Sequence, residues 1–107
     1  MKYRTTPAFD ADVRRLSREE YTKFRTVVRD HFVPAAERVA ARPGSKWPRG
    51  LRVKDVEGAH GIWELTWDWP DGRATFEWIE VDGEPAIQWR RVGGHDIFGD
   101  PAREARR

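Results

Sequence analysis

A strict alternation of large apolar and polar residues is the feature that most constrains this chain. From Trp63 to Trp69 a large apolar side chain occupies every second position, with a polar one between each pair. Successive side chains of a strand point to opposite faces, so this spacing predicts a strand with one apolar face and one solvated, polar face. The same period recurs in 51–54, 73–78 and 87–90, and turn-forming Pro-Asp-Gly and Asp-Gly sequences separate the last three strands. The sequence therefore predicts an antiparallel sheet of about four strands.

Apolar residues in the first forty positions follow a helical spacing instead. Thr6-Pro7 is typical of a helix start, and Ser17 to Glu20 is typical of a capping box, so two helices are predicted. Pro34 predicts that the second helix ends at Val33, with 34–41 as a further helical piece. The helices are expected to form a hairpin that covers the apolar face of the sheet. The predicted fold class is therefore α+β, with two layers.

Composition narrows the class of protein further. The chain has 107 residues, which is enough for one domain, and its six Trp and five Phe can supply a small core. The start of the chain is polar and no apolar run approaches 18 residues, so we expect no membrane span and a cytoplasmic location. Cysteine is lacking and the three His residues lie far apart in the sequence. No metal site and no other cofactor is expected.

Charge is distributed unevenly along the chain, although the formal net charge is only +2. From Arg42 to Lys54 there are five cations and no anion, whereas from Asp55 to Glu84 nine acids accompany a single base. Segregated cations indicate an anionic partner, although such a run can also be a solvated loop. We expect the run to follow an RNA backbone, with Trp47 either stacking on a base or packing against a helix. The predicted RNA-binding residues are Arg49, Arg52, Lys54, Trp47 and Arg90.

Four segments follow one another with an order and spacing that match a known family. They are a helix-hairpin pattern from Pro7 through Glu20 to Phe24, a strand with a Gly turn at Val56-Glu57-Gly58 followed by Gly61-Ile62-Trp63-Glu64-Leu65, a turn and Arg-led strand at Asp71-Gly72-Arg73-Ala74-Thr75-Phe76, and a final Val92-Gly93-Gly94-His95-Asp96-Ile97-Phe98. Together they resemble the RelE/ParE superfamily of bacterial toxins from type II toxin–antitoxin pairs, over roughly Tyr3 to Phe98. The resemblance implies a single RelE-like toxin domain over 1–98 and a basic, flexible tail over 99–107.

In the RelE branch, the resemblance implies a toxin that enters the ribosomal A site and cleaves messenger RNA. It also implies a cognate antitoxin as protein partner. Arg73 takes the place of an arginine that this branch keeps at the start of the strand after the turn, and His95 takes that of an arginine or histidine near the C-terminus. Two sites depart from the pattern. Phe98 stands where many members have tyrosine, and Asp55 and Glu57 stand about where the RelE toxin has basic residues.

The chemistry of metal-independent RNA cleavage leads to the same region. It requires a base for the 2′-hydroxyl, cations for the charge that develops on phosphorus, and an acid for the leaving oxygen. His95 lies beside a Gly-Gly step that follows the basic pair 90–91, and imidazole titrates near neutrality. Arg73 and one of these two arginines could bind the phosphate, with Glu57 or Asp55 as the base. The predicted catalytic residues are Arg73, His95, Arg91 and Glu57.

Three functions remain open at the level of the sequence. The first is a ribosome-dependent endoribonuclease that cleaves mRNA and inhibits translation, with the ribosome and mRNA as partners. The second is a ParE-like toxin that inhibits DNA gyrase by binding. The third is a binding relative without catalytic activity. The positions of Arg73 and His95 favour the first function, whereas Phe98 and the two acids favour the third.

Overall fold

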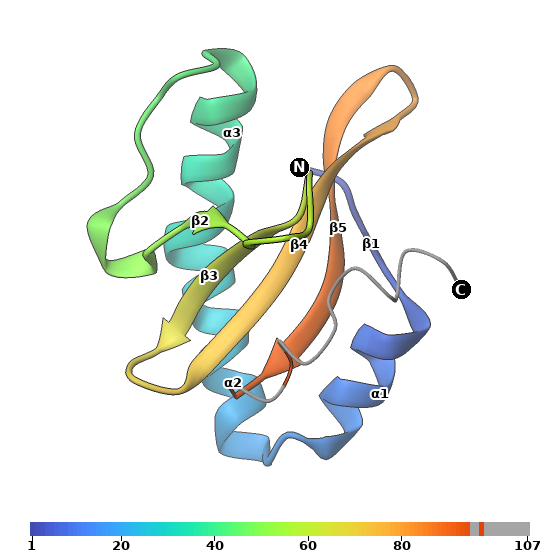
Figure 1. The fold of residues 1–107 in the computed structure, drawn as a ribbon, viewed down its shortest axis with the longest axis vertical. Coiled ribbons are helices and arrows are strands. Elements are labelled where there is room, and N and C mark those ends of the chain that lie inside the picture. Colours follow the sequence, from blue (N-terminus) through green and yellow to red (C-terminus); the bar gives the residue numbers. More distant parts are fainter. Residues whose placement is uncertain (95–96, 98–107) are drawn as a thin grey trace.

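Helices pack on one face of a five-stranded sheet (Figure 1). The structure is a computed structural model and describes residues 1–94 and 97. His95, Phe98 and the predicted tail at 99–107 lie outside the described residues. In chain order the elements are β1 (Tyr3–Thr5), α1 (Pro7–Arg15), α2 (Arg18–Val27), the π-helical turn η1 (Val28–Phe32), α3 (Val33–Ala41), the 3-10 turn η2 (Arg49–Leu51), β2 (Lys54–Asp55), β3 (Trp63–Asp68), β4 (Gly72–Val81) and β5 (Glu84–Gly93).

The sheet confirms the predicted fold class and adds a strand to it. Its order is β1-β5-β4-β3-β2, and the pairings from β5 to β2 are antiparallel. The added strand is β1, which runs parallel to β5 at one edge, with Tyr3 opposite Ile87. The expected strand over 51–54 is wrong in its bounds, because 49–51 form the turn η2 and only Lys54 and Asp55 pair with β3.

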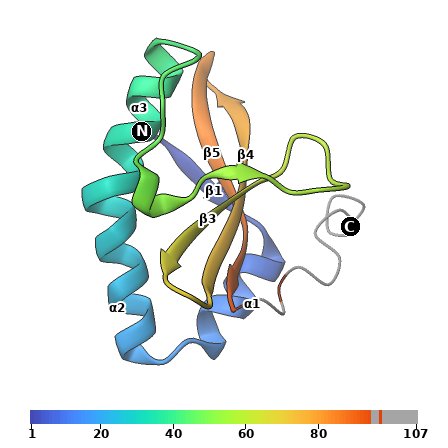
Figure 2. The ribbon, with the colours of Figure 1, turned by 60° about the vertical axis from the view of Figure 1, so that its left-hand side comes forward.

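Both predicted helix starts are confirmed, but the second helix does not end where the sequence predicted. The side chain of Thr6 caps α1, and Ser17 and Glu20 form a capping box at the start of α2. The helix then continues through η1 into α3, so that 18–41 form one long helix (Figure 2). In the wider π turn the Val33 N–H donates to the Val28 carbonyl, five residues back. Pro34, which has no N–H to donate, follows directly after this wider turn, so the long helix continues past it.

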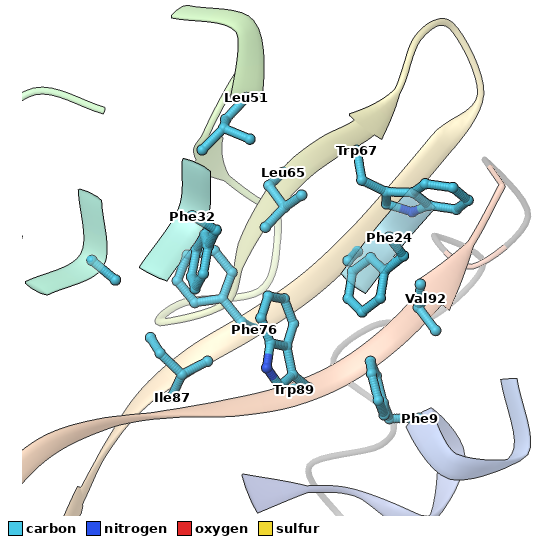
Figure 3. Close-up of a cluster of buried hydrophobic side chains, with 12 residues drawn as sticks. Phe9, Phe24, Phe32, Leu51, Leu65, Trp67, Phe76, Ile87, Trp89 and Val92 are labelled. Atoms are coloured by element: carbon cyan, nitrogen blue, oxygen red, sulfur yellow. The ribbon is translucent and has the colours of Figure 1, made fainter. Parts of the chain in front are cut away.

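Aromatic rings fill the space between the long helix and the sheet (Figure 3). Phe32 on the helix has its ring centroid 4.9 Å from that of Phe76 and 5.0 Å from that of Trp89. Trp47 extends this cluster, because its ring stacks on Phe32 at 5.4 Å with an interplanar angle of 14°. Trp47 therefore packs against the helix, which is the second of the two roles that its position in the sequence allowed.

The polar face of the sheet is less solvated than its sequence predicted. Four residues on it are buried: Glu64, Thr66, Thr75 and Arg90. The loop 56–62 projects on this side, away from the long helix (Figure 2), and its Ala59 and Ile62 are buried too. The prediction of a solvated face is wrong for these four residues, because other parts of the chain cover them.

Candidate nucleic-acid interface

An exposed tryptophan with two arginines against it lies where β3 turns into β4. Trp69 is 61% exposed, whereas Trp67, two residues earlier, is only 5% exposed. The guanidinium carbon of Arg52 lies 3.9 Å from the centroid of the Trp69 ring, and that of Arg73 lies 5.6 Å from it. Both distances are within the range of a cation–π contact. We call Arg52, Trp69 and Arg73 the Trp69 cluster.

The turn that carries this cluster is held from several sides. Asp68 pairs with Gly72 across the turn, and a Cβ on Gly72 would lie only 2.7 Å from the Cβ of Asp68. The carboxylate of Asp68 also forms a 3.0 Å ion pair with Lys23 on α2. Just inside the turn, the Trp67 Nε1–H donates a hydrogen bond of 2.9 Å to the backbone carbonyl of Arg73. The Trp69 cluster therefore stands on a closely fitted turn that is joined to both the helix layer and the core.

The cationic loop (42–54), which leads from α3 to β2, exposes all five of its basic residues: Arg42, Lys46, Arg49, Arg52 and Lys54. Arg52 has a left-handed backbone, with φ 48° and ψ 44°, a conformation uncommon for a residue other than glycine. Lys54 differs from the others in forming a 3.2 Å ion pair with Glu64, whose side chain is 11% exposed. The loop thus contributes one cation, Arg52, to the Trp69 cluster.

The predicted phosphate-binding arginines fall into two groups. Arg73 is partly exposed and lies opposite Gly93 in the sheet, so it adjoins the end of the strand that leads to His95 in the sequence. Arg91 instead donates two hydrogen bonds, of 2.6 and 3.1 Å, to the buried carboxylate of Asp12 on α1. The buried Arg90 forms an ion pair with Glu77. Both strand arginines are therefore engaged with carboxylates of the protein itself.

Glu57, the predicted base, is exposed but lies far from Arg73 along the sheet. It follows Val56, whose N–H donates to the carbonyl of Ile62 just before β3 begins. Arg73 pairs with Thr66, four residues further on, which is about 13 Å along a strand. The predicted set is therefore not assembled at one point: Arg73 adjoins the end of β5, Glu57 lies toward the opposite end of β3, and His95 is outside the described residues.

The described part of the chain holds neither a metal cluster nor a membrane-spanning helix. Within residues 1–94 and 97, no three His, Cys, Asp or Glu side chains gather as a metal site would require. Every helix in that same part is too short or too polar to cross a bilayer.

Comparison with solved structures identifies the architecture. A YoeB/ParE toxin from Agrobacterium tumefaciens matches with a TM-score of 0.59 and 14% sequence identity, over 89% of this chain and 99% of that chain. The RelE/ParE-like fold is therefore confirmed. The solution structure of a conserved hypothetical protein, HP0894 from Helicobacter pylori, matches with a TM-score of 0.44 and 16% identity, over 90% of this chain and 96% of that one. No protein-family model matches the sequence, and no curated protein matches it significantly.

This RelE/ParE-like fold has a second surface feature, on its helical side. A groove of about 980 Å³ lies between β1, α1 and the long helix, with Phe9, Phe24 and Phe32 among its lining residues. Its charged lining residues include one acid and four bases: Asp10, Lys2, Arg14, Arg25 and Arg29. Lys2 and Arg29 form ion pairs with Asp82 and Asp30, respectively. The groove thus combines an apolar floor with a border that has more basic than acidic residues, although two of the bases are paired with acids outside the lining.

Trp69 is the residue of this interface that sequence reasoning missed. The alternation from Trp63 assigned it to the apolar side of the strand, together with Trp67. The strand ends at Asp68, however, and the pairing of β3 with β4 shifts register between Thr66 and Asp68. The Pro-Asp-Gly sequence that follows Trp69 was the one available signal, because a residue next to a turn need not follow the alternation of its strand.

Proposed function

We propose that this chain is the toxin of a toxin–antitoxin pair and a metal-independent endoribonuclease that cleaves mRNA on the ribosome. The observation that carries the proposal is the position of Arg73. It is partly exposed, it adjoins the strand end that leads to His95, and it belongs to the Trp69 cluster, to which the cationic loop contributes Arg52. The similarity to a YoeB/ParE toxin supports the toxin part of the proposal at the level of the fold.

The proposed reaction is an attack of the 2′-hydroxyl oxygen on the adjacent phosphorus. The bond to the 5′-oxygen of the next nucleotide breaks, which yields a 2′,3′-cyclic phosphate and a 5′-hydroxyl end. Arg73 donates to the phosphate oxygens as negative charge develops on them, and His95 donates the proton that the leaving oxygen takes. Because Glu57 lies toward the other end of β3, the proton of the 2′-hydroxyl passes to a water molecule in this scheme instead of to Glu57.

Arg90 and Arg91 are given a positioning role in this proposal. Arg91 is joined to Asp12, and the same carboxylate accepts a 3.1 Å hydrogen bond from the Val92 N–H. These contacts tie α1 to the end of β5, immediately before the segment that contains His95. Arg90 joins β5 to β4 through Glu77. The two arginines would therefore fix the strand end instead of binding the phosphate.

Inhibition of DNA gyrase by binding is the second candidate function. One observation favours it: the described residues do not bring the predicted base beside Arg73, and both strand arginines are engaged with carboxylates. A toxin that acts by binding alone needs no acid–base pair. It would still use the exposed cationic loop and the Trp69 cluster as the surface that binds an anionic partner.

The proposed antitoxin would occupy the groove between β1, α1 and the long helix. An amphipathic segment with an apolar stripe fits the aromatic floor, and acidic side chains beside that stripe fit the basic border. We therefore expect the antitoxin to present an acidic, amphipathic segment. A small reading frame next to the gene of this chain is where such an antitoxin is to be sought.

Induced expression with mapping of message ends tests the proposed function. Cells that express the chain are expected to stop growing, and a reporter message is expected to be cut within its coding region. The same message without a start codon is expected to stay intact, because cleavage requires translation. Growth arrest with an intact translated message and a change in plasmid supercoiling would support gyrase inhibition and contradict the endoribonuclease.

A further inference from the structure

We propose that Trp69 is a stacking site for a nucleobase of a single-stranded nucleic acid, with Arg52 and Arg73 binding the phosphates on either side of that base. Stacking and phosphate binding at this point follow from the geometry of the Trp69 cluster. The identity of the strand as mRNA rests on the proposed function.

The Trp69 ring is largely exposed to solvent. The tryptophans within the sheet strands are buried or partly buried, whereas Trp69, just after β3, is 61% exposed. An indole offers a large, flat apolar surface, and leaving it in water forgoes the stabilisation that burial gives. Every nucleobase has a flat π face that matches this surface, and stacking on an aromatic side chain needs no particular base sequence.

Two arginines lie against the Trp69 ring. Their guanidinium carbons lie 3.9 and 5.6 Å from the centroid of the Trp69 ring. A base stacked on the indole brings its own two phosphates to the neighbourhood of the ring, within reach of both side chains. Guanidinium groups bind phosphate oxygens through paired N–H donors, so these two arginines suit that task better than ammonium groups would.

The turn that carries Trp69 is held on both sides of that residue. The Lys23–Asp68 ion pair, the close fit at Gly72 and the hydrogen bond from Trp67 to the Arg73 carbonyl hold the residues on both sides of Trp69. A stacking residue on a fixed support binds with less loss of conformational entropy than one on a loose loop. Arg52 covers part of the ring at 3.9 Å, so the base stacks on the surface of the indole that Arg52 leaves exposed.

The charge around the cluster favours a nucleic acid over a protein partner. Arg52 and Arg73 lie against the ring, and Lys23 lies beside them on Asp68. The turn itself carries two acids, Asp68, which is paired with Lys23, and Asp71, which is exposed. These three cations outnumber the two acids at the turn, as a surface for a phosphate backbone requires.

A binding experiment with an oligonucleotide that cannot be cleaved tests the proposal. The probe is a single-stranded 2′-O-methyl RNA of about ten nucleotides, titrated into the full chain. Trp69→Ala is expected to raise the Kd about 5- to 150-fold, which corresponds to about 1–3 kcal/mol for the loss of one stacked base. Trp69→Phe is expected to keep most of the affinity. Tyr3→Ala is the matched control, because Tyr3 is a 67% exposed aromatic on β1, at the other edge of the sheet from β2.

A second probe separates stacking from any indirect effect of the substitution. An abasic strand of the same length keeps the phosphates and lacks the bases, so wild type and Trp69→Ala are expected to bind it equally. The proposal is overturned if folded Trp69→Ala binds the 2′-O-methyl strand as wild type does, or if it loses as much affinity for the abasic strand. It is also overturned if a duplex of equal length, whose bases are already stacked, binds wild type as tightly as the single strand.

The outcome is independent of the test of the proposed function. Trp69-dependent binding in a chain that leaves messages intact would sustain the stacking site and reject the endoribonuclease. Message cleavage by a chain whose single-strand binding ignores Trp69 would reject the stacking site and leave the endoribonuclease standing. Protection of Trp69 by a protein partner, with no binding of either strand, would also reject the stacking site.

Discussion

The indole of Trp67 donates a hydrogen bond of 2.9 Å to the backbone carbonyl of Arg73. A ring of the core therefore holds the start of β4, the strand that carries the proposed catalytic arginine. On its other side the Trp67 ring meets Phe24 of α2 edge-on, with the ring centroids 5.8 Å apart. The aromatic core and the candidate interface are therefore joined through one side chain. A substitution in this core is expected to affect the interface as well as the stability.

Trp67→Ala is expected to lower the free energy of unfolding by about 3–5 kcal/mol, because it removes a buried indole and leaves a cavity. Trp67→Phe keeps a ring in that place but lacks the Nε1–H donor, and is expected to cost about 1–2 kcal/mol. Chemical denaturation of the three proteins measures both values. An unchanged denaturation midpoint for Trp67→Ala would mean that this side of β3 does not face the core.

Asp12→Ala is expected to destabilise the chain by about 3 kcal/mol, because it leaves Arg91 without the carboxylate that it binds and the buried Val92 N–H without its acceptor. Asp10→Ala is the matched control. Asp10 lies on the same helix but is exposed, and its loss is expected to change stability by less than about 0.5 kcal/mol. Equal thermal midpoints for the two variants would contradict the structural role that we assign to the Asp12–Arg91 pair.

Much of the fold could be predicted from local sequence signals, and the errors arise where distant segments meet. The alternation in β3 and the capping residues Thr6 and Ser17 act within a few residues, and the structure confirms them. Strand β1 has no such signal. Its three residues are exposed, and it forms only because β5, more than eighty residues later, offers a free edge. The continuation of the helix past Pro34 likewise depends on a π turn that no local pattern indicates.

The candidate interface could be predicted only in part, because some of its residues have local sequence signals and others depend on contacts between distant segments. Arg73 was found because it begins a strand after a recognisable turn. The ion pair of Arg91 was not predicted, because its partner Asp12 is 79 residues away in the sequence. It also depends on a register shift between β4 and β5 next to Thr75. Trp69 was missed because periodicity alone cannot show that a strand ends one residue earlier.

The cationic loop is expected to bind single-stranded RNA through its phosphates. Replacing Arg42, Lys46 and Arg49 by Gln should weaken binding and reduce the dependence of log Kd on log salt, because fewer counterions are released. Lys54 is left in place, since Glu64 needs its ammonium partner. The control replaces Arg14, Arg25 and Arg29 of the groove, which removes the same charge elsewhere. Equal salt dependence in both triple variants would exclude the loop from the interface.

The groove variant has an expected effect of its own. If an acidic segment of the antitoxin occupies the groove, Gln at positions 14, 25 and 29 should weaken the toxin–antitoxin complex, whereas the loop variant should leave it unchanged. Calorimetry with the antitoxin encoded beside this chain measures both. A groove variant that binds the antitoxin with wild-type affinity would place the antitoxin on another surface.

The most direct test of the proposed function is primer extension on a defined message that purified bacterial ribosomes are translating. The wild-type chain is expected to produce new 5′ ends within the coding region, and the upstream fragment is expected to end in a 2′,3′-cyclic phosphate. Message without ribosomes is expected to show no new 5′ ends. His95→Ala is expected to lower the cleavage rate by about 10²–10⁴-fold, and Arg73→Ala to lower it similarly, with ribosome binding little changed. A message that stays whole with wild-type protein, or that both variants cut at the wild-type rate, would contradict the account.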